Sequence, residues 1–411
     1  MPEHVNDLVA RAAALDAADE LSAHREAFVP ADGLVAYLDG NSLGRPLRAT
    51  RDRLVDLVDG AWGTRLIRSW DEGWFDAPTE LGDLLGRIAL GAAAGQTVVA
   101  DSTTVMLYKL ARAAVDLRPG RDEVVLDADN FPTDRFVLEG VAAERGLTLR
   151  WVRTDPEQGV TPEALAEVVG GRTALVLLSH VDFRSARVAD LPAVTAVAHA
   201  AGALVLWDLS HAVGALDLAL DADDVDLAVG CSYKYLNGGP GAPAFGYVAR
   251  RLHAELRQPI QGWMGAADPF AMGDRYEPAP GIRGLVSGTP PILGMEPVRD
   301  MLALLDEVGM TSVRAKSVAL TQFAIEVHDA LLAPLGVRLA SPRGASVRGG
   351  HVTFEHPDFR RTVAELWRQG VVPDFRPPQG LRVGLSPLST SFREVLVGLR
   401  AVADELDPEA R

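Results

Sequence analysis

The 411-residue sequence contains a single cysteine, Cys231. One thiol excludes a disulfide within the chain and a metal site built from several cysteines. Basic residues are also scarce, because 40 lysines and arginines stand against 56 aspartates and glutamates, for a net charge of −16. Nucleic acids and anionic membranes are bound through clusters of lysine and arginine. The composition therefore argues against both as partners and favours a reducing cytoplasm.

Long apolar segments are missing as well. We see no run that approaches the roughly 20 residues of a membrane span. The first 20 residues are amphipathic and acidic, so we expect no signal peptide. Hydrophobic residues make up 48% of the sequence and charged residues 23%, which is typical of a globular protein. A chain of this length has room for two or three domains.

From about residue 98 to 250, short apolar runs alternate with helical stretches. The runs are nearly continuous in valine, leucine and alanine, so both faces of their sheet should be covered. Thr161 and Asp190, each followed closely by proline, are typical of helix starts between strands. This order predicts an α/β fold with a mostly parallel sheet between helix layers. The expected strands are Glu123–Leu126, Leu149–Val152, Ala174–Leu178, Ala203–Trp207 and Asp226–Gly230.

The rest of the chain differs in composition and in periodicity. Residues 260–291 are rich in tryptophan, glycine and proline and predict an ordered loop region, which is often functional. A helical pattern then runs from about Met295 to Leu332, and a small α+β unit with a helix near Phe359–Gln369 follows it. We expect an N-terminal arm over residues 1–50 that packs with the other domains. A large cofactor-binding domain over 51–294 and a small C-terminal domain over 295–411 complete the expected organisation.

Two reactive side chains follow expected strands. Asp208 ends one strand, and Lys234 follows the next, between Tyr233 and Tyr235 and ahead of a glycine-rich turn. Ligands bind at the carboxyl ends of parallel strands. Pyridoxal phosphate needs a lysine for its Schiff base and a carboxylate that keeps its pyridine nitrogen protonated. Taken alone, these two residues also fit a helix cap and a surface lysine, so the pattern needs further support.

Two more segments supply that support. Residues 101–104, Asp-Ser-Thr-Thr, open a helical stretch, and backbone N–H groups and hydroxyls at a helix N-terminus favour an anion such as a phosphate. Residues 130–134, Asn-Phe-Pro-Thr-Asp, follow another expected strand. There Phe131 has a ring that can stack on a flat cofactor, and Asp134 adds a second acid. The four elements together predict a pyridoxal phosphate site.

Six sequence blocks resemble those of kynureninases, which are fold-type-I pyridoxal phosphate enzymes. The resemblance covers roughly residues 35–395, and the block around Lys234 together with GNSLG is the part most specific to that family. The blocks are YLDGNSLGRPL (37–47), WGTRLIRSW (62–70), ADSTTVMLYK (100–109), NFPTDRFVLEG (130–140), DLSHAVGA (208–215) and CSYKYLNGGPGAPAF (231–245). Such a resemblance implies a large domain with a mostly parallel sheet and a small α+β domain.

It also implies roles for individual residues. Lys234 would form the Schiff base and serve as the base, and Asp208 would hold the pyridine nitrogen. Tyr233 would line the cofactor near its phosphate, and it would either donate a proton as well or serve in phosphate binding alone. Arg382 would hold the substrate α-carboxylate, and the arm residues Asn41 and Ser42 would approach the substrate. Trp263 and Thr289 would reach the phosphate of the neighbouring subunit, which implies a homodimer with shared active sites. The remaining residues expected to line the cofactor are Thr103, Thr104, Phe131, Asp134, Ser179 and His211.

The implied reaction is hydrolysis of the Cβ–Cγ bond of L-kynurenine or 3-hydroxykynurenine, which gives an anthranilate and L-alanine. A kynureninase-like enzyme that acts on another amino acid, as a β-lyase or an aminotransferase, is the main alternative. A cysteine desulfurase is disfavoured because Cys231 ends a buried strand, and a cofactor-binding protein without activity is the non-enzymatic alternative. We find no metal-ligand spacing. The sequence leaves open the choice among tryptophan catabolism, nicotinamide cofactor synthesis and secondary metabolism.

Several positions depart from the family pattern. Ala266 stands where histidine is usual, Ser389 where tyrosine is usual, and Met106 where asparagine is frequent. Asp182 and Phe183 replace an Asn-Tyr pair. We expect these departures to lie nearer the substrate than the cofactor, so the cofactor is better determined than the substrate.

Overall fold

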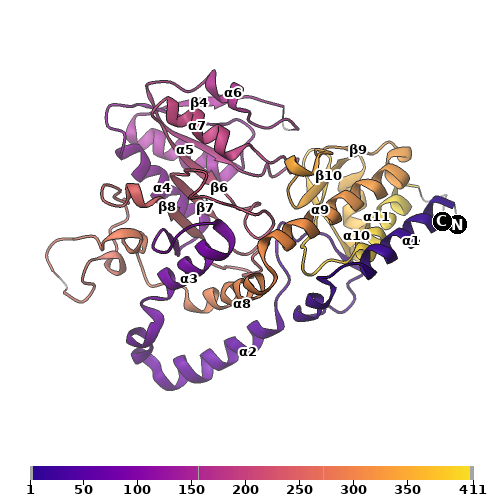
Figure 1. The fold of residues 1–411 in the computed structure, drawn as a ribbon, viewed down its shortest axis with the longest axis horizontal. Coiled ribbons are helices and arrows are strands. Elements are labelled where there is room, and N and C mark those ends of the chain that lie inside the picture. The colour runs from indigo at the N-terminus through magenta and orange to yellow at the C-terminus, as the bar shows by residue number, and fades with distance from the viewer. Residues whose placement is uncertain (1–2, 156, 272, 408–411) are drawn as a thin grey trace.

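The computed structural model describes residues 3–155, 157–271 and 273–407 (Figure 1). A seven-stranded sheet with the order β2-β8-β7-β6-β5-β3-β4 forms the larger part. Strands β3 to β7 pair in parallel, whereas β8 is antiparallel to β7 and to β2. The strands are β2 Thr97–Val99, β3 Glu123–Asp127, β4 Thr148–Val152, β5 Thr173–Ser179, β6 Leu204–Asp208, β7 Leu227–Gly230 and β8 Phe245–Val248.

The predicted α/β fold is confirmed, and all five expected strands are present with ends that differ by one residue. Strands β2 and β8 were not expected, because each is only three or four residues long and carries no readable periodicity. The two helix starts are also confirmed. The Thr161 hydroxyl accepts a hydrogen bond from the N–H of Ala164 at 3.2 Å, and the Asp190 carboxylate accepts one from Ala193 at 3.1 Å.

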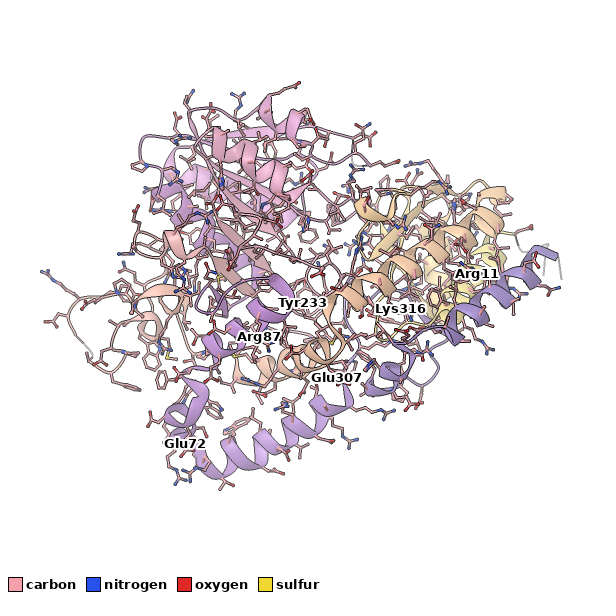
Figure 2. The ribbon with its side chains drawn as sticks, in the orientation of Figure 1. Arg11, Glu72, Arg87, Tyr233, Glu307 and Lys316 are labelled. Atoms are coloured by element: carbon pink, nitrogen blue, oxygen red, sulfur yellow. The ribbon has the colours of Figure 1, made fainter. Side chains whose placement is uncertain are left out.

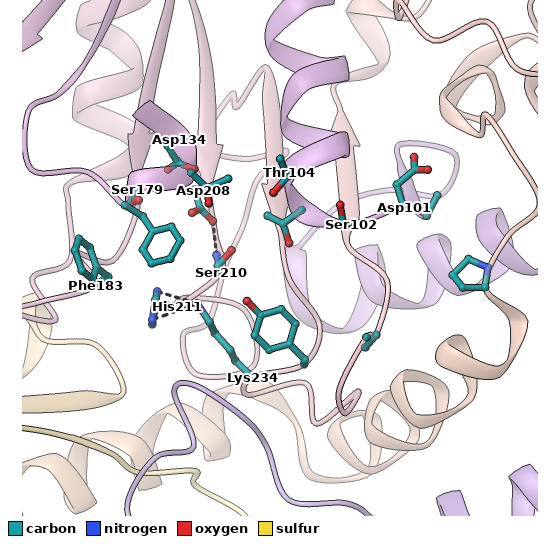
Figure 3. Close-up of a pocket in the computed structure, with 18 of the residues that line it drawn as sticks. Asp101, Ser102, Thr104, Asp134, Ser179, Phe183, Asp208, Ser210, His211 and Lys234 are labelled. Atoms are coloured by element: carbon teal, nitrogen blue, oxygen red, sulfur yellow. Dashed lines mark hydrogen bonds between the residues drawn. The ribbon is translucent and has the colours of Figure 1, made fainter. Parts of the chain in front are cut away.

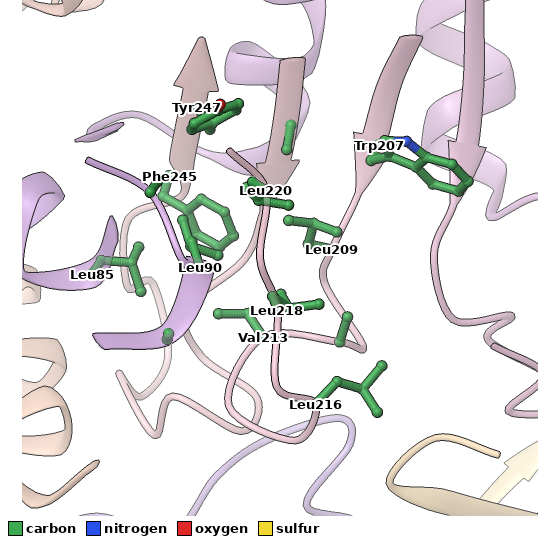
Figure 4. Close-up of a cluster of buried hydrophobic side chains, with 14 of the residues drawn as sticks. Leu85, Leu90, Trp207, Leu209, Val213, Leu216, Leu218, Leu220, Phe245 and Tyr247 are labelled. Carbon is green, nitrogen blue, oxygen red and sulfur yellow. The ribbon is translucent and has the colours of Figure 1, made fainter. Parts of the chain in front are cut away.

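Helices cover both faces of this sheet, which explains its continuous apolar runs. On β5, Leu175 and Leu177 point to one face, whereas Val176 and Leu178 point to the other. Figure 4 shows part of the second cluster, in which Trp207 and other strand side chains gather. The first face is covered by α4 Thr103–Asp116 and α5 Pro132–Arg145. The second is covered by α3 Ala77–Leu85, α6 Pro162–Ala166, α7 Leu191–Ala200 and α8 Ile292–Val308.

A second sheet lies toward the C-terminus, with the antiparallel order β12-β13-β10-β9. The expected continuous helical run from Met295 to Leu332 is wrong, because Gly309, at φ 82°, separates α8 from α9. The elements of this part are α9 Met310–Val327, β9 Arg338–Leu339, β10 His351–Glu355, α10 Phe359–Arg368, β11 Val371–Val372, β12 Asp374–Arg376, β13 Gly380–Gly384 and α11 Phe392–Leu406.

The N-terminal segment crosses between the two parts. Helix α1 Glu3–Ala17 packs along α11, and β1 Ala36–Tyr37 pairs in parallel with β11. Figure 2 shows Lys316 on α9, where its ammonium forms a buried ion pair with Asp19. Helix α2 Arg48–Asp56 then packs against α8. Side chains of α8 pack with the large sheet, whereas those of α9 divide between the two cores, so the boundaries at 50/51 and 294/295 stay predictions.

One helical stretch, Met310–Leu335, is long and apolar enough to cross a membrane by length and composition alone. The stretch is not a continuous apolar run, because it includes Arg314, Lys316 and Glu326. Leu320, Phe323 and Ala324 of this stretch pack in the core beside α11. A buried core helix meets the same criterion, so its apolar character follows from its place in the fold.

Candidate active site

The carboxyl ends of β5, β6 and β7 open onto a cavity of about 540 Å³ (Figure 3). Side chains that are far apart in the sequence meet there, and more than 180 residues separate the first from the last. The predicted site residues that line it are Thr103, Thr104, Phe131, Asp134, Ser179, Asp208, His211, Tyr233, Lys234 and Thr289. Trp263, Arg382, Asn41 and Ser42 are not among its lining residues.

Lys234 differs from the other lysines of the chain. The sequence has only three, and Lys109 and Lys316 are held by Asp101 and Asp19 in ion pairs. No ion pair joins Lys234 to a carboxylate anywhere in the described ranges. Its Nζ lies 3.3 and 3.4 Å from the two ring nitrogens of His211 and 5.9 Å from the Phe131 ring centre. A buried amine that faces a cavity without a counter-charge is suited to react with a carbonyl group.

Two carboxyl groups stand on the opposite side of the cavity. Asp208 ends β6 and accepts a hydrogen bond from the N–H of Ser210 at 2.7 Å. Burial raises the pKa of Asp134 well above its ordinary value, and the charge of Asp208 raises it further. The raised pKa favours the protonated form of the Asp134 carboxyl. A carboxyl group at the position of Asp208 is suited to partner the pyridine nitrogen of the cofactor.

His211 and Tyr233 complete the surroundings of Lys234. Burial lowers the pKa of His211 well below its ordinary value, and the charge of Lys234 lowers it further, so the imidazole is neutral. Burial raises the pKa of Tyr233, so its phenol keeps its proton and can act as a donor. Behind His211 lies His351, whose ring centre is 5.6 Å away.

The expected anion site lies at the N-terminus of α4. The Ser102 hydroxyl accepts a hydrogen bond from the N–H of Val105 at 3.4 Å, and Thr103 and Thr104 line the cavity. The fully buried Lys109 supports this turn from behind, because its Nζ donates to Asp101 at 2.5 Å and to the carbonyl of Leu285 at 2.8 Å. The turn therefore presents hydroxyls and a helix N-terminus to the cavity from a rigid base.

Phe183 is a cavity residue for which we expected no binding role. Its ring lies edge-on against Phe131, with ring centres 5.3 Å apart. The preceding Asp182 accepts hydrogen bonds from the N–H groups of Arg184 and Ser185 and so fixes the turn. The only signal in the sequence was that Phe183 departs from the family pattern.

The N-terminal arm brings Asn41 and Ser42 to Arg382. Arg382 Nη2 lies 3.3 Å from the Ser42 hydroxyl, and its Nη1 donates to the carbonyl of Phe183, so Arg382 stands directly behind the cavity wall. Asn41 is fully buried against Gly384, where a Cβ atom would lie 1.9 Å from the Asn41 Oδ1. A Cβ at Gly44 would lie 2.3 Å from the carbonyl of Lys234. These close approaches explain glycine at both positions.

The other departures lie apart from the cavity, against expectation. Met106 is buried in the core against Gly246, and Ser389 lines a separate cavity with Arg45 and Arg48. Ala266 lies beside Trp263 on a loop turn. Their side chains therefore do not approach a substrate within this chain. Phe183 alone among the departures lines the site.

Trp263 and Thr289 do not lie together. Trp263 is 45% exposed and lies outside the cavity, where its ring packs edge-on against Phe270. Thr289 lines the cavity of its own chain. The predicted contribution of Trp263 and Thr289 across a subunit boundary stays a prediction.

Known structures and sequences match this arrangement. The cysteine desulfurase CsdA from Escherichia coli has a TM-score of 0.78 at 18% identity, and the match covers 95% of this chain and 99% of that one. A mutant of the enzyme C-DES, with glycine covalently linked to its pyridoxal phosphate, has a TM-score of 0.79 at 18% identity, covering 90% of this chain and 96% of that one. These structures share the fold.

Closer relatives are found by sequence. Kynureninase from Pseudomonas fluorescens is 39% identical over 401 residues, which cover 96% of this chain and 94% of that protein. Kynureninase from Burkholderia pseudomallei is 39% identical over 406 residues, covering 97% and 95%. Residues 313–402 match the family model described as the kynureninase C-terminal domain. Identity of this degree over nearly the full length shows that the chain belongs to the kynureninase family.

Proposed function

We propose that this protein is a pyridoxal phosphate-dependent hydrolase that cleaves the Cβ–Cγ bond of L-kynurenine or its 3-hydroxy derivative. One observation carries the proposal. The unpaired amine of Lys234 and the carboxylate of Asp208 enter one cavity from neighbouring strand ends, in a chain 39% identical to kynureninases. The products would be an anthranilate and L-alanine.

The cavity fits the cofactor by its chemistry. Its size lies within the range of ligand pockets. Its lining brings together the Lys234 amine, the carboxyl groups of Asp134 and Asp208, the hydroxyls of Thr103 and Thr104 and the ring of Phe131, which match the groups of pyridoxal phosphate. Thr103 and Thr104 would take the phosphate, Phe131 would cover the ring, and Asp208 would hold the ring nitrogen. When bound, pyridoxal phosphate supplies a carbonyl for the Schiff base and a ring that accepts electrons.

The side chains of this chain would then bind and move protons. Arg382 would hold the α-carboxylate, since a guanidinium fork suits a planar carboxylate. Lys234 Nζ would take the proton from Cα. Water adds to the Cγ carbonyl, the Cβ–Cγ bond breaks, and Cγ leaves as the carboxyl group of the anthranilate. The Tyr233 hydroxyl would give Cβ its proton, which completes the methyl group, and Lys234 would return a proton to Cα, which completes L-alanine.

We also propose a homodimer whose active sites are shared through Trp263. Exposed apolar side chains support it, because Trp62, Leu66 and Ile67 lie on the segment after α2 with 52–77% of their surface exposed. Patches of this kind mark protein interfaces. A single free thiol, buried at Cys231, fits a reducing cytoplasm, and the acidic composition fits neither a membrane surface nor a nucleic acid as partner.

The proposal is tested with purified protein loaded with pyridoxal phosphate. L-kynurenine should release fluorescent anthranilate, and Lys234→Ala should abolish the release. Lys234→Arg is the matched control, because it keeps a cation but cannot form the Schiff base, and it should be equally inactive. A substrate-dependent change in cofactor absorption without anthranilate would contradict kynurenine hydrolysis. Formation of an α-keto acid in that case would indicate an aminotransferase.

A further inference from the structure

The second sheet turns one face to the active site and the other to its own core. Phe354 on β10 and Leu381 and Val383 on β13 point into the apolar core. The register places Asp374 and Thr353 on either side of Arg382, one on each neighbouring strand. Side chains paired in register project from the same face of a sheet. Arg382 therefore has an acid as its direct neighbour on β12.

The contacts of the Arg382 guanidinium follow from this register. Its Nε donates to Asp374 Oδ2 at 2.8 Å, and its Nη2 lies 2.5 Å from the same oxygen in an ion pair. Its Nη1 donates to the carbonyl of Phe183 at 2.5 Å, and its Nη2 lies 3.3 Å from the Ser42 hydroxyl. Asp374 Oδ2 also accepts from Arg376 Nε at 2.7 Å. Arg382 is 1% exposed, so these contacts set its orientation.

A guanidinium is planar, and a carboxylate can approach it along a side edge or at the end of the fork. Asp374 occupies the side edge formed by Nε and Nη2. Away from Asp374, Nη1 has one N–H besides the one that meets the Phe183 carbonyl, and Nη2 makes only the long 3.3 Å contact with the Ser42 hydroxyl. We propose that Asp374 is a positioning residue that reserves the end of the Arg382 fork for the substrate α-carboxylate. The inference rests on the proposed function, because it takes Arg382 as the carboxylate site.

A simple counter-charge would behave in the opposite way. Asp374 is an anion beside the place where a second anion is to bind. If it only balanced the charges of Arg382 and Arg376, its removal would strengthen binding of the carboxylate. If it positions the fork, its removal lets Arg382 turn, and binding weakens. The sign of the change in KM therefore decides between the two roles.

The kinetic test compares Asp374→Ala, Asp374→Asn and Asp374→Glu with Glu355→Gln. Glu355 lies on the same sheet, but it pairs with Arg338 at the exposed edge, so it matches the loss of one charge without touching Arg382. We expect KM to rise by about tenfold or more in the alanine variant, less in the asparagine variant and least in the glutamate variant. The value of kcat should change by less than about threefold, because the contact serves ground state and transition state alike. An unchanged or lowered KM in the alanine variant would overturn the proposal.

A binding measurement separates this proposal from the proposed function. The probe is kynurenine without its α-amino group. It is titrated calorimetrically in two forms, as the carboxylate and as the carboxamide. The wild type should prefer the carboxylate, and Asp374→Ala should lower that preference by about tenfold. In an Arg382→Lys background the Asp374 substitution should have no further effect, because lysine has no fork to orient. A further loss there would show that Asp374 acts elsewhere. The titration needs no turnover, so a failure of kynurenine hydrolysis leaves this test intact.

Discussion

Lys109 provides a direct test of what holds residues 101–104, the expected phosphate site, in place. The side chain is fully buried, and its ammonium bridges Asp101 and the carbonyl of Leu285. Lys109→Met keeps most of the volume and removes the charge, so Asp101 and the Leu285 carbonyl lose their donor. Breaking a buried ion pair costs about 3–5 kcal/mol. The Asp101 side chain is 22% exposed and gains some hydration, so we expect a loss near the lower end, about 3 kcal/mol.

The same variant should lose cofactor affinity. Asp101 has a left-handed backbone, at φ 56°, and directly precedes Ser102 and the two threonines that line the cavity, Thr103 and Thr104. Without Lys109 the turn is free to shift. The loss of one charge-assisted hydrogen bond to the phosphate, about 1.5–3 kcal/mol, corresponds to a Kd for pyridoxal phosphate about 10- to 100-fold higher.

Lys316→Met is the matched control. Lys316 also forms a buried ion pair, with Asp19, but it joins α9 to the N-terminal segment and does not line the cavity. Both variants should lower the thermal midpoint of the apoprotein, measured by circular dichroism. Only Lys109→Met should weaken binding of pyridoxal phosphate, measured by absorption titration. Equal affinities in the two variants would refute the role given to Lys109.

Three further predictions concern other parts of the molecule. Gly44→Ala should lower kcat/KM by about tenfold or more, because the added Cβ would meet the Lys234 carbonyl. Gly60 lies at an open helical position, so Gly60→Ala is the control and should leave kcat/KM unchanged. Equal effects of the two substitutions would contradict the docking of the arm. Borohydride reduction of the loaded protein should leave the cofactor on the Lys234 peptide alone, and mass spectrometry would expose a label on either other lysine. Burial lowers the pKa of His180 to about 4. The unfolded chain takes up a proton at this residue below about pH 6.5, whereas the folded chain does so only near pH 4. The free energy of unfolding should therefore fall between those two pH values, by up to about 1.4 kcal/mol per pH unit. His180→Gln should flatten that dependence in thermal unfolding, and an unchanged slope would assign the acid sensitivity to other groups.

The sequence predicted those parts of the fold in which one physical requirement dominates. Strands β5 and β6 are buried on both faces, so their apolar runs are continuous and easily read. Strand β8 spans only four residues after a glycine- and proline-rich turn, and pairing with β2 and β7 defines it. The break at Gly309 was missed for a similar reason, because one glycine does not interrupt an apolar helical pattern.

The residues of the site also divide into those that the sequence could predict and those that it could not. Lys234 and Asp208 were predictable because the carboxyl ends of parallel strands converge, whichever residues fill the space between them. The pairing of Asp374 with Arg382 depends on the register of β12 and β13 across a turn, and no pattern within either strand reveals it. The departures show a further limit. Met106 and Ser389 differ from the family pattern, yet only the fold shows that they face the core and a separate cavity.

The arm connects the two halves of the proposed chemistry. The N–H of Gly40 donates to the carbonyl of Gly384, at the end of the strand that carries Arg382, with a distance of 3.0 Å. Four residues later, the N–H of Gly44 donates to the carbonyl of Tyr233, next to Lys234, at 2.9 Å. This short backbone segment therefore sets the distance between the carboxylate site and the amine. An insertion or deletion between Gly40 and Gly44 would move one relative to the other, even with every side chain of the cavity in place. The GNSLG sequence accordingly functions as a fixed-length connection between the two sheets, which explains why its glycines matter as much as its polar side chains.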